Sequence, residues 1–417
     1  MKNIIIIGGG IIGLSSAYYL SRDGHRVTVL DKGDFLDNCS YGNAGYVCPS
    51  HFVPLAAPGI IKQGLRWMLD PQSPFYVKPA LNWSLIDWGF RFMKSASKRN
   101  VQNAAMPLRD IALLSQEQYA GWARLPGFDF SYEHKGLLEI FQTQKMADHA
   151  VHTVHAAKEL GLEVELLDKA AMQAKEPQTP INAMGAIFFK CDAHLYPNRL
   201  MTNLISHLKT AGVSFEAGQE VIRFEKKANR ISKVITSSRS FDEVDEAVLA
   251  SGSWSRGLAA QLQLKIPLVA GRGYSITLED SPYQLNYPAI LTEGRVAITP
   301  MDGNKIRFGG TMEVVTTDTP PRFNRVNGIL RAVKGFIPSF DVPRPADNKI
   351  WYGYRPCSAD GVPYIGRSTR TPNLVVATGH AMLGLSLGAG TGLLVKELVN
   401  GEKPSIDLRA FDAERFH

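Results

Sequence analysis

Three glycines near the N-terminus stand at a spacing that suits the binding of a phosphate group: Gly8, Gly10 and Gly13. They follow a run of isoleucines at residues 4–7, which is typical of a strand buried on both faces of a parallel sheet. The first glycine permits a tight turn, the second lets a phosphate approach the backbone, and the third lets a helix pack closely on the strand. Ile11 and Ile12 open that helix, whose free N–H groups would face the phosphates.

The elements that must position this turn form a β-α-β unit. Residues 14–21 are predicted to form a helix that stops near Gly24, and residues 25–30 a second strand. That strand ends at Asp31, eighteen residues beyond Gly13, and Lys32 follows it. A carboxylate there can accept hydrogen bonds from ribose hydroxyls. Because all these parts occur in order, the sequence predicts dinucleotide binding, but the unit alone suits FAD and NAD equally.

Three further stretches of small residues are predicted to contact the cofactor. The first is a loop at residues 40–45, and the second is a strand and turn at residues 247–255. The third is a strand at residues 373–378, which is followed by a glycine-rich turn and a helix at residues 385–399. Ligands of open α/β sheets bind at the carboxyl ends of the strands. A surface loop or an ordinary strand-turn-helix is the alternative. The candidate contacts are Ser40, Asn43, Ala44, Gly45, Ser251, Gly252, Trp254, Gly379, His380, Gly384 and Leu385.

Composition narrows the class of protein. A chain of 417 residues, 45% hydrophobic and 20% charged, is typical of a soluble protein with more than one domain. It carries neither a secretory signal pattern nor an apolar stretch long enough to span a membrane. Its four cysteines are scattered, which argues against a disulfide framework and against a metal site. We therefore expect a cytoplasmic protein that holds no metal.

Positive charge gathers between residues 60 and 99, where seven basic residues stand against two acidic ones and where three of the six tryptophans lie. Lys and Arg attract anionic lipid, and Trp favours the headgroup region. The stretch therefore suggests peripheral contact with the inner face of the cytoplasmic membrane; a helical arm with a solvated basic edge is the alternative. Because the excess is local and no recognised motif accompanies it, we expect no nucleic-acid partner.

These stretches together resemble the FAD-dependent amine oxidoreductases of the D-amino-acid oxidase family, which include glycine oxidase, sarcosine oxidase and the bacterial D-amino-acid dehydrogenases. The resemblance is strongest to the D-amino-acid dehydrogenase small-subunit type and spans nearly the whole chain. It rests on residues 40–45, residues 54–59, a Lys/Trp/Met-rich segment, residues 271–278, residues 351–366 (WYGYRPCSADGVPYIG) and residues 377–379.

The resemblance implies FAD as the cofactor. It places the glycines of the first turn and Asp31 at the adenosine diphosphate part, the loop at residues 43–45 along the ribityl chain, and the backbone of Val221 at the adenine. The turns at Ser251 and at residues 379–385 would flank the pyrophosphate and the flavin. Gly353 stands where sarcosine oxidase relatives carry a cysteine that tethers the flavin, so no tether is expected.

The resemblance also implies catalytic residues. Arg355 would bind the carboxylate of the substrate with two parallel hydrogen bonds. Tyr274 and Tyr354 would close over the carboxylate or the amine, with a role as core aromatics as the alternative. Of the histidines, His51 is the better catalytic candidate and His380 the weaker, and a merely packed ring is the alternative for each.

The predicted fold is a two-domain α/β flavoprotein. A Rossmann-like FAD domain of the glutathione-reductase type would take residues 1–55, 196–265 and 345–417. A substrate domain on a mixed sheet would take residues 56–195 and 266–344, with strands at residues 135–141 and 273–278.

The predicted function is oxidative deamination of a small amino acid, foremost a D-amino acid, by hydride transfer to the flavin. The imine product would hydrolyse to a 2-oxo acid and ammonia, and a quinone or an electron-transfer protein would take the electrons. Oxidation of cyclic imino acids such as hydroxyproline or proline stereoisomers, oxidation of N-methyl glycines, and electron transfer to oxygen stay open. So does a non-catalytic flavin-binding subunit, although a carboxylate clamp would serve no purpose there.

Overall fold

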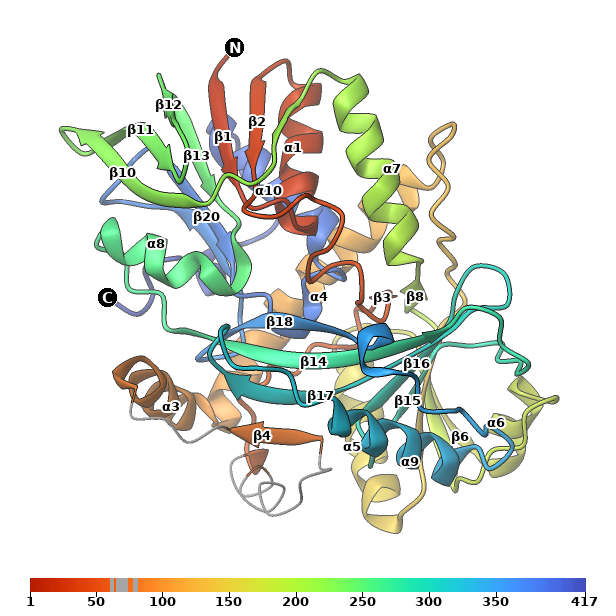
Figure 1. Cartoon of the computed structure of the whole chain (residues 1–417). Coiled ribbons are helices and arrows are strands. Elements are labelled where there is room, and N and C mark those ends of the chain that lie inside the picture. The colour runs from red at the N-terminus through yellow and green to blue at the C-terminus, as the bar shows by residue number, and fades with distance from the viewer. Residues whose placement is uncertain (61–63, 65–73, 78–81) are drawn as a thin grey trace.

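The computed structural model describes residues 1–60, 64, 74–77 and 82–417. Within these residues the chain builds a smaller sheet of six strands and a larger sheet of nine strands, which lie in the upper and lower halves of Figure 1. The protein therefore has a mixed α/β fold.

The smaller sheet has the order β19-β20-β13-β1-β2-β9, and its pairs are parallel except β19 with β20. Ile4 and Ile6 of β1 pack among the helices on one face, whereas Ile5 and Ile7 pack on the other face against an antiparallel meander and α8. The isoleucine run is thus buried on both sides, as its pattern predicts. Its elements are β1 (Asn3–Ile7), β2 (Arg26–Leu30), β9 (Ser214–Glu216), β13 (Glu246–Leu249), β19 (Tyr364–Arg367), β20 (Leu374–Thr378), the helices α1 (Ile11–Arg22), α4 (Lys98–Trp122), α7 (Pro197–Thr210), α8 (Ser255–Gln261) and α10 (Gly388–Asn400), and the meander β10 (Val221–Lys227), β11 (Arg230–Thr236) and β12 (Ser240–Asp242).

The larger sheet has the order β18-β14-β17-β16-β15-β5-β7-β6, and β4 pairs with β17 beside this path. One face packs on α9, and α5 covers part of the opposite face. Its elements are β4 (Phe75–Val77), β5 (Leu137–Phe141), β6 (Val164–Asp168), β7 (Gly185–Phe189), β14 (Leu268–Leu278), β15 (Ala289–Leu291), β16 (Val296–Pro300), β17 (Ile306–Val315), β18 (Trp351–Ser358), α5 (Gln144–Glu159), α6 (Lys169–Lys175) and α9 (Val326–Phe336).

Short elements complete the fold. β3 (Tyr46–Val47) pairs with β8 (Ala193–His194), and α3 (Trp83–Ser95) lies beside β4 and α4 in Figure 1. Single turns of 3-10 helix are η1 (Gly252–Trp254), η2 (Phe323–Arg325), η3 (Asp347–Lys349), η4 (Ala381–Leu383) and η5 (Arg409–Phe411). No helix in the described part of the chain combines the length and the apolar character needed to cross a bilayer.

Two details differ from the predicted architecture. β18 lies in the segment 345–417, which the sequence assigns to the nucleotide domain, yet β18 pairs with β14 in the larger sheet. The last helix begins at Gly388 rather than at Leu385, because η4 occupies the preceding turn. The division into two domains stays a proposal.

Candidate active site

A cavity of about 2440 Å³ is lined by residues of both large sheets. Pockets for small ligands are usually ~300–1,000 Å³, so this one has room for a dinucleotide and a small second molecule. The turn after β1 borders the cavity, as do η1, η4, and the strands β14, β17 and β18.

The first glycine turn has the close backbone contacts that its spacing predicts. Gly8 has a φ of +114°, and a Cβ there would lie 2.5 Å from the carbonyl oxygen of Ala250. A Cβ at Gly13 would lie 1.9 Å from the carbonyl oxygen of Gly8. Asp31 holds the turn in place, since its Oδ2 accepts a hydrogen bond from the amide of Gly9 at 2.7 Å. A larger residue at position 8 would therefore collide with the turn after β13, and one at position 13 would push α1 away from β1.

Most of the predicted cofactor contacts line the cavity, and the dinucleotide fits this end of it. The amide of Ile11 is not free for a phosphate, however, because it donates to Oγ of Ser40 at 3.0 Å. The predicted contacts on the cavity wall are Gly8, Gly10, Ile11, Ile12, Asp31, Lys32, Ser40, Asn43, Ala44, Val221, Ser251, Gly252, Trp254, His380, Gly384 and Leu385.

Three predicted contacts, Gly13, Gly45 and Gly379, lie behind the cavity wall. Each is close to another part of the fold: Gly13 to Gly8, Gly45 to the carbonyl oxygen of Leu195, and Gly379 to the ring of Tyr364. They support the wall from behind. Glycine is therefore required at these positions by close contacts within the fold and not by direct contact with the cofactor.

Arg355 lies on the face of the larger sheet opposite α9. Its guanidinium rests on β14, where a Cβ at Gly273 would lie 2.2 Å from Nη2, and its Nη1 donates to the carbonyl oxygen of Thr311 at 2.6 Å. Among the described residues, no Asp or Glu forms an ion pair with it. Burial lowers the pKa of Arg355 from its ordinary value. A cation on a cavity wall without an acidic partner is suited to an anionic ligand.

Thr311 presents its carbonyl to Arg355 from a distorted position. The pairing of β14 with β17 shifts register between Arg272 and Tyr274, and Thr311 has a φ of +62° at this bulge. A β-branched residue with positive φ is strained, and such strain is concentrated at functional sites. The bulge therefore serves to aim a carbonyl at the guanidinium.

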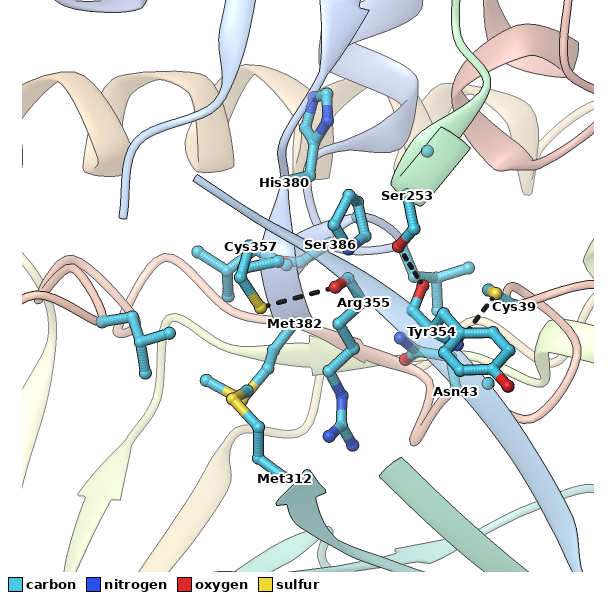
Figure 2. Close-up of a pocket in the computed structure, with 18 of the residues that line it drawn as sticks. Cys39, Asn43, Ser253, Met312, Tyr354, Arg355, Cys357, His380, Met382 and Ser386 are labelled. Carbon is cyan, nitrogen blue, oxygen red and sulfur yellow. Dashed lines mark hydrogen bonds between the residues drawn. The ribbon is translucent and has the colours of Figure 1, made fainter. Parts of the chain in front are cut away.

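Tyr274 and Tyr354 were predicted to close over the substrate. This prediction is wrong for their hydroxyl groups, which do not face Arg355. Both residues border the cavity, but alternation along the strands turns their side chains to the face opposite that of Arg355. The hydroxyl of Tyr274 donates to Oε2 of Glu313 at 2.7 Å, and that of Tyr354 donates to the carbonyl oxygen of Thr317 at 2.9 Å. Figure 2 shows the ring of Tyr354 directed away from the guanidinium.

The two candidate histidines have different surroundings. His380 points away from Arg355 in Figure 2, and its Nε2 is 3.1 Å from Oγ1 of Thr391 inside the protein. Burial lowers the pKa of His380 to about 3. His51 borders the cavity, and its Nδ1 is 3.3 Å from Oγ of Ser50. Of these two candidates, His51 is therefore better suited to contact a substrate.

The surroundings of His51 include residues that the sequence did not single out. β3 pairs with β8, and this brings Cys48 and Ser50, which follow β3, next to Asp192, which precedes β8. Cys48, His51 and Asp192 hold possible metal-ligand atoms within 4.8 Å of one another, a set that their sequence spacing conceals. Ser50 and Asp192 are joined by two hydrogen bonds, so this cluster is already bonded internally. The four cysteines are free, as their scatter predicts.

Helix α3 buries one side and exposes the other. Trp88 is buried, and its Nε1 donates to the carbonyl oxygen of Cys357 at 3.0 Å. The opposite side is apolar and open to solvent, with exposed fractions of 85% for Trp83, 47% for Ile86, 66% for Phe90 and 53% for Met93. Much of the predicted basic stretch, including Lys62, Arg66, Trp67, Asp70 and Lys78, lies outside the described residues.

Comparison with known proteins gives consistent matches. The family model described as DAO, FAD dependent oxidoreductase, matches residues 3–398. The chain is 34% identical to a D-amino acid dehydrogenase of Granulibacter bethesdensis over 97% of both chains. It is 31% identical to D-amino acid dehydrogenase 1 of Mesorhizobium japonicum over 99% of both chains.

Solved structures with low sequence identity share the fold. Glycine oxidase from Geobacillus kaustophilus superposes with a TM-score of 0.80 at 23% identity, covering 100% of this chain and 99% of that one. L-proline dehydrogenase from P. horikoshii superposes with a TM-score of 0.74 at 18% identity, covering 100% and 97%.

Proposed function

The chain belongs to the DAO family of FAD-dependent oxidoreductases, and on that premise we propose that it catalyses the oxidative deamination of a small amino acid, foremost a D-amino acid. The names of its relatives support this substrate class, since the first relatives given above are D-amino acid dehydrogenases.

Arg355 is the observation that carries the proposal. Its guanidinium is a buried cation on the cavity wall, and no described acidic residue forms an ion pair with it. An α-carboxylate would supply the missing negative charge and accept two parallel hydrogen bonds. Bound in this way, the α-carbon of the substrate is held at a fixed place on the cavity wall, and that orientation is a main contribution to catalysis.

The chemistry divides between cofactor and chain. When bound, FAD would supply the oxidising group for loss of a hydride from the α-carbon of the substrate, and hydrolysis of the resulting imine would give a 2-oxo acid and ammonia. The chain holds the cofactor at the turn formed by Gly8 and Gly10, braced by Asp31. It holds the substrate at Arg355 on the wall of the cavity.

Anaerobic reduction of the flavin tests the proposal. The purified holoenzyme is mixed with D-amino acids, their L-enantiomers, cyclic imino acids and N-methyl glycines, and bleaching of the flavin absorbance is followed. Rapid bleaching by a D-amino acid is the expected result. Bleaching confined to cyclic or N-methylated substrates moves the assignment to those classes, and no bleaching by any of them overturns an enzymatic role. Readmitted oxygen then separates an oxidase, which reoxidises quickly, from a dehydrogenase.

We also propose that α3 rests on an anionic membrane surface, where a quinone would take the electrons. The exposed side of α3 presents Trp83, Ile86 and Phe90, and the exposed cations Lys94 and Lys98 lie at its C-terminal end. Apolar side chains next to cations are typical of interfacial helices. Leu85, Trp88, Gly89, Phe92 and Met93 of the same helix line the cavity, which supports α3 as the side from which an acceptor approaches.

A further inference from the structure

We propose that Arg307 is a positioning residue for the cofactor. It holds the loop at residues 41–44 so that the amides of Gly42 and Ala44 face the cavity, where they can donate to oxygen atoms of bound FAD. The inference concerns FAD, on which the family depends, and it does not require that the substrate be a D-amino acid.

The side chain of Arg307 is a buried cation that binds backbone carbonyl groups. It projects from β17, and 5% of the residue is exposed. Its Nη1 donates to the carbonyl oxygens of Tyr41 at 2.8 Å and Asn43 at 2.7 Å. Its Nε donates to Oγ1 of Thr277 at 3.0 Å, and its Nη2 donates to Oδ1 of Asn198 at 2.9 Å. The guanidinium thus binds the loop with one nitrogen and is itself held in place by the other two.

The charge of Arg307 has no acidic partner at close range. Among the described residues, no Asp or Glu forms an ion pair with it, and Glu279, which acts on it from a distance, pairs with Lys305. Burial lowers the pKa of Arg307 to about 10, which leaves the group charged at neutral pH. A buried cation is costly unless polar groups surround it, and here carbonyl and hydroxyl oxygens do so. A purely structural contact with the loop could be made by a neutral side chain without this cost.

Two hydroxyl groups complete the contact of the larger sheet with the loop. Oγ of Ser275 donates to the carbonyl oxygen of Gly42 at 3.0 Å, and Oγ1 of Thr299 donates to that of Ala44 at 2.7 Å. Together with the guanidinium, these side chains bind four consecutive carbonyl groups of the loop. The loop therefore has one fixed orientation relative to β14, β16 and β17.

The direction of the carbonyls determines the direction of the amides. The carbonyl of one residue and the amide of the next belong to the same trans peptide group and point in opposite directions. The carbonyl of Tyr41 faces Arg307, so the amide of Gly42 faces away from it. The carbonyl of Asn43 likewise turns the amide of Ala44 away. Because the loop lines the cavity and the guanidinium does not, both amides point to the cavity side of the loop.

These two amides are available to a ligand. The amides of Tyr41, Asn43 and Gly45 already have acceptors in or just before the loop. In the part of the chain that the structure describes, the amides of Gly42 and Ala44 have none. A carbonyl that accepts from a cation makes the amide of the same peptide group a stronger donor. Two such donors on the cavity wall are suited to hydroxyl, phosphate or carbonyl oxygens of FAD.

The contact with the loop lies on the same strand as the substrate site. Gly273, Ser275 and Thr277 are alternate residues of β14 and share its cavity face. Gly273 lies under the guanidinium of Arg355, whereas Ser275 binds the loop and Thr277 binds Arg307. Four residues of a strand span about 13 Å, so this strand sets the distance between the carboxylate site and the cofactor loop.

Titration of FAD into the stripped protein tests the proposal. In Arg307→Met, a side chain of similar length can no longer bind the loop, and the Kd for FAD should rise by about 10–100-fold, the range found for groups that support the ligands of a metal. Arg307→Lys keeps the charge and a donor group, so its Kd should lie between those of Arg307→Met and the unmodified protein. The change of flavin fluorescence on binding measures Kd, and circular dichroism shows whether each variant is folded.

Arg415→Met is the matched control. Arg415 also donates to backbone carbonyls, those of Val362 and Pro363, and it pairs with Asp360. None of these four residues lines the cavity. The variant should therefore lower the melting temperature without changing the Kd for FAD, which separates positioning of the loop from a general loss of stability.

Hydrogen exchange in the unmodified protein tests the inference without any substitution, in case Arg307→Met does not fold. FAD should slow the exchange of two amides in a peptide that contains residues 40–45, those of Gly42 and Ala44, because the neighbouring amides are already hydrogen-bonded. Mass spectrometry of the stripped protein and of the holoenzyme makes the comparison.

Each contrary result has a definite meaning. A folded Arg307→Met with an unchanged Kd for FAD overturns the proposal, as does an equal rise of Kd in Arg415→Met. Absence of protection by FAD at residues 40–45 overturns donation by the two amides. These results leave the proposed function intact. Absence of flavin reduction by any amino acid removes that function but not this inference, because no substrate enters these measurements.

Discussion

Arg355 and the glycine beneath it make up a small unit for holding a carboxylate. The guanidinium lies on β14 where Gly273 leaves room, and the carbonyl of Thr311 fixes one end of it. Arg355→Ala should leave FAD bound and raise the KM for the substrate about 100-fold, since a charged bidentate pair is lost. Arg355→Lys keeps the charge without the planar fork and should give an intermediate KM. Steady-state kinetics with flavin absorbance as a measure of bound FAD make the comparison.

Normal kinetics in Arg355→Ala would contradict a role in the active site. Gly273→Ala supplies a control at the same place, because its Cβ would meet the guanidinium and displace it without removing the charge. It should raise KM as well, and an unchanged KM would show that the position of the guanidinium does not matter.

Buried His380 should make the stability of the protein depend on pH. Its pKa is about 3 in the folded protein and near 6.5 in an unfolded chain, so below pH 6.5 only the unfolded chain takes up a proton. The stability that the neutral ring contributes is present above pH 6.5 and is lost as the pH falls. At pH 5 the loss is about 2 kcal/mol. In His380→Gln, which keeps a donor for Thr391, denaturant unfolding should show a stability difference between pH 7 and pH 5 that is smaller by this amount.

A variant with the same difference between pH 7 and pH 5 as the unmodified protein would mean that His380 is protonated in the folded state.

At the scale of residues, features that depend on neighbouring residues in the sequence could be predicted. Contacts that depend on how distant strands pair could not. The turn of Gly8 and the place of Asp31 follow from spacing within one β-α-β unit. The direction of the Tyr274 side chain depends on the register between β14 and β17, which a bulge shifts. The contact of Ser50 with Asp192 joins residues 142 positions apart, and no local pattern encodes it.

Among the elements, α3 leaves several large apolar side chains exposed on one side. Replacing Trp83 and Phe90 by Ser should reduce binding to vesicles that contain anionic phosphatidylglycerol, because apolar contact with the headgroup region is lost. Binding of the unmodified protein should weaken at high salt and be weak on neutral phosphatidylcholine vesicles, because cations next to α3 contribute. Co-sedimentation at low and high salt measures both effects.

Met106→Ser on α4 is the matched control, since Met106 is 55% exposed but lies outside the apolar side of α3. It should bind vesicles as the unmodified protein does. If the unmodified protein stays in the supernatant at low salt, the membrane proposal fails, and α3 is then simply a helix with one exposed side.

The elements themselves were largely predictable from the sequence. The buried runs at β1 and β20 lie where hydrophobic patterns place them. The start of α10 was missed by three residues, because Gly384 to Leu387 are compatible with a helix while η4 and its connection occupy this turn. The sheet to which β18 belongs was not readable either, since β18 joins its partner β14 across about eighty residues of sequence, beyond the reach of any local pattern.

At the scale of the whole molecule, the cavity links the two large sheets. Its walls come from the smaller sheet through the turn after β1 and from the larger sheet through β14, β17 and β18. The cofactor would therefore touch both, and its binding should stabilise the protein as a unit. This stabilisation depends on the shared cavity more than on the proposed domain boundaries. Any ligand that binds only the folded chain raises the stability of that chain.

Removal of FAD should lower the melting temperature, and restoring it should reverse the change. At a free concentration 100 times its Kd, FAD adds about 2.7 kcal/mol, or roughly 3 °C for a chain of this length that unfolds as a unit. NAD at the same concentration should add nothing, although the β-α-β unit alone suits both, because the chain belongs to an FAD-dependent family. Differential scanning calorimetry of the stripped protein with each nucleotide makes the measurement.

The variant Gly13→Ala tests whether the stabilisation by FAD depends on the glycine turn after β1. Its Cβ would lie 1.9 Å from the carbonyl oxygen of Gly8, so α1 must move away from β1 and the phosphate site opens. We expect the variant to lose the FAD-dependent rise in melting temperature, whereas Gly121→Ala, which has no atom within 4 Å of the added Cβ, keeps it. If FAD raises the melting temperature of Gly13→Ala as much as that of the unmodified protein, the turn does not contribute to FAD binding. The cofactor site would then have to lie on the wall formed by the larger sheet.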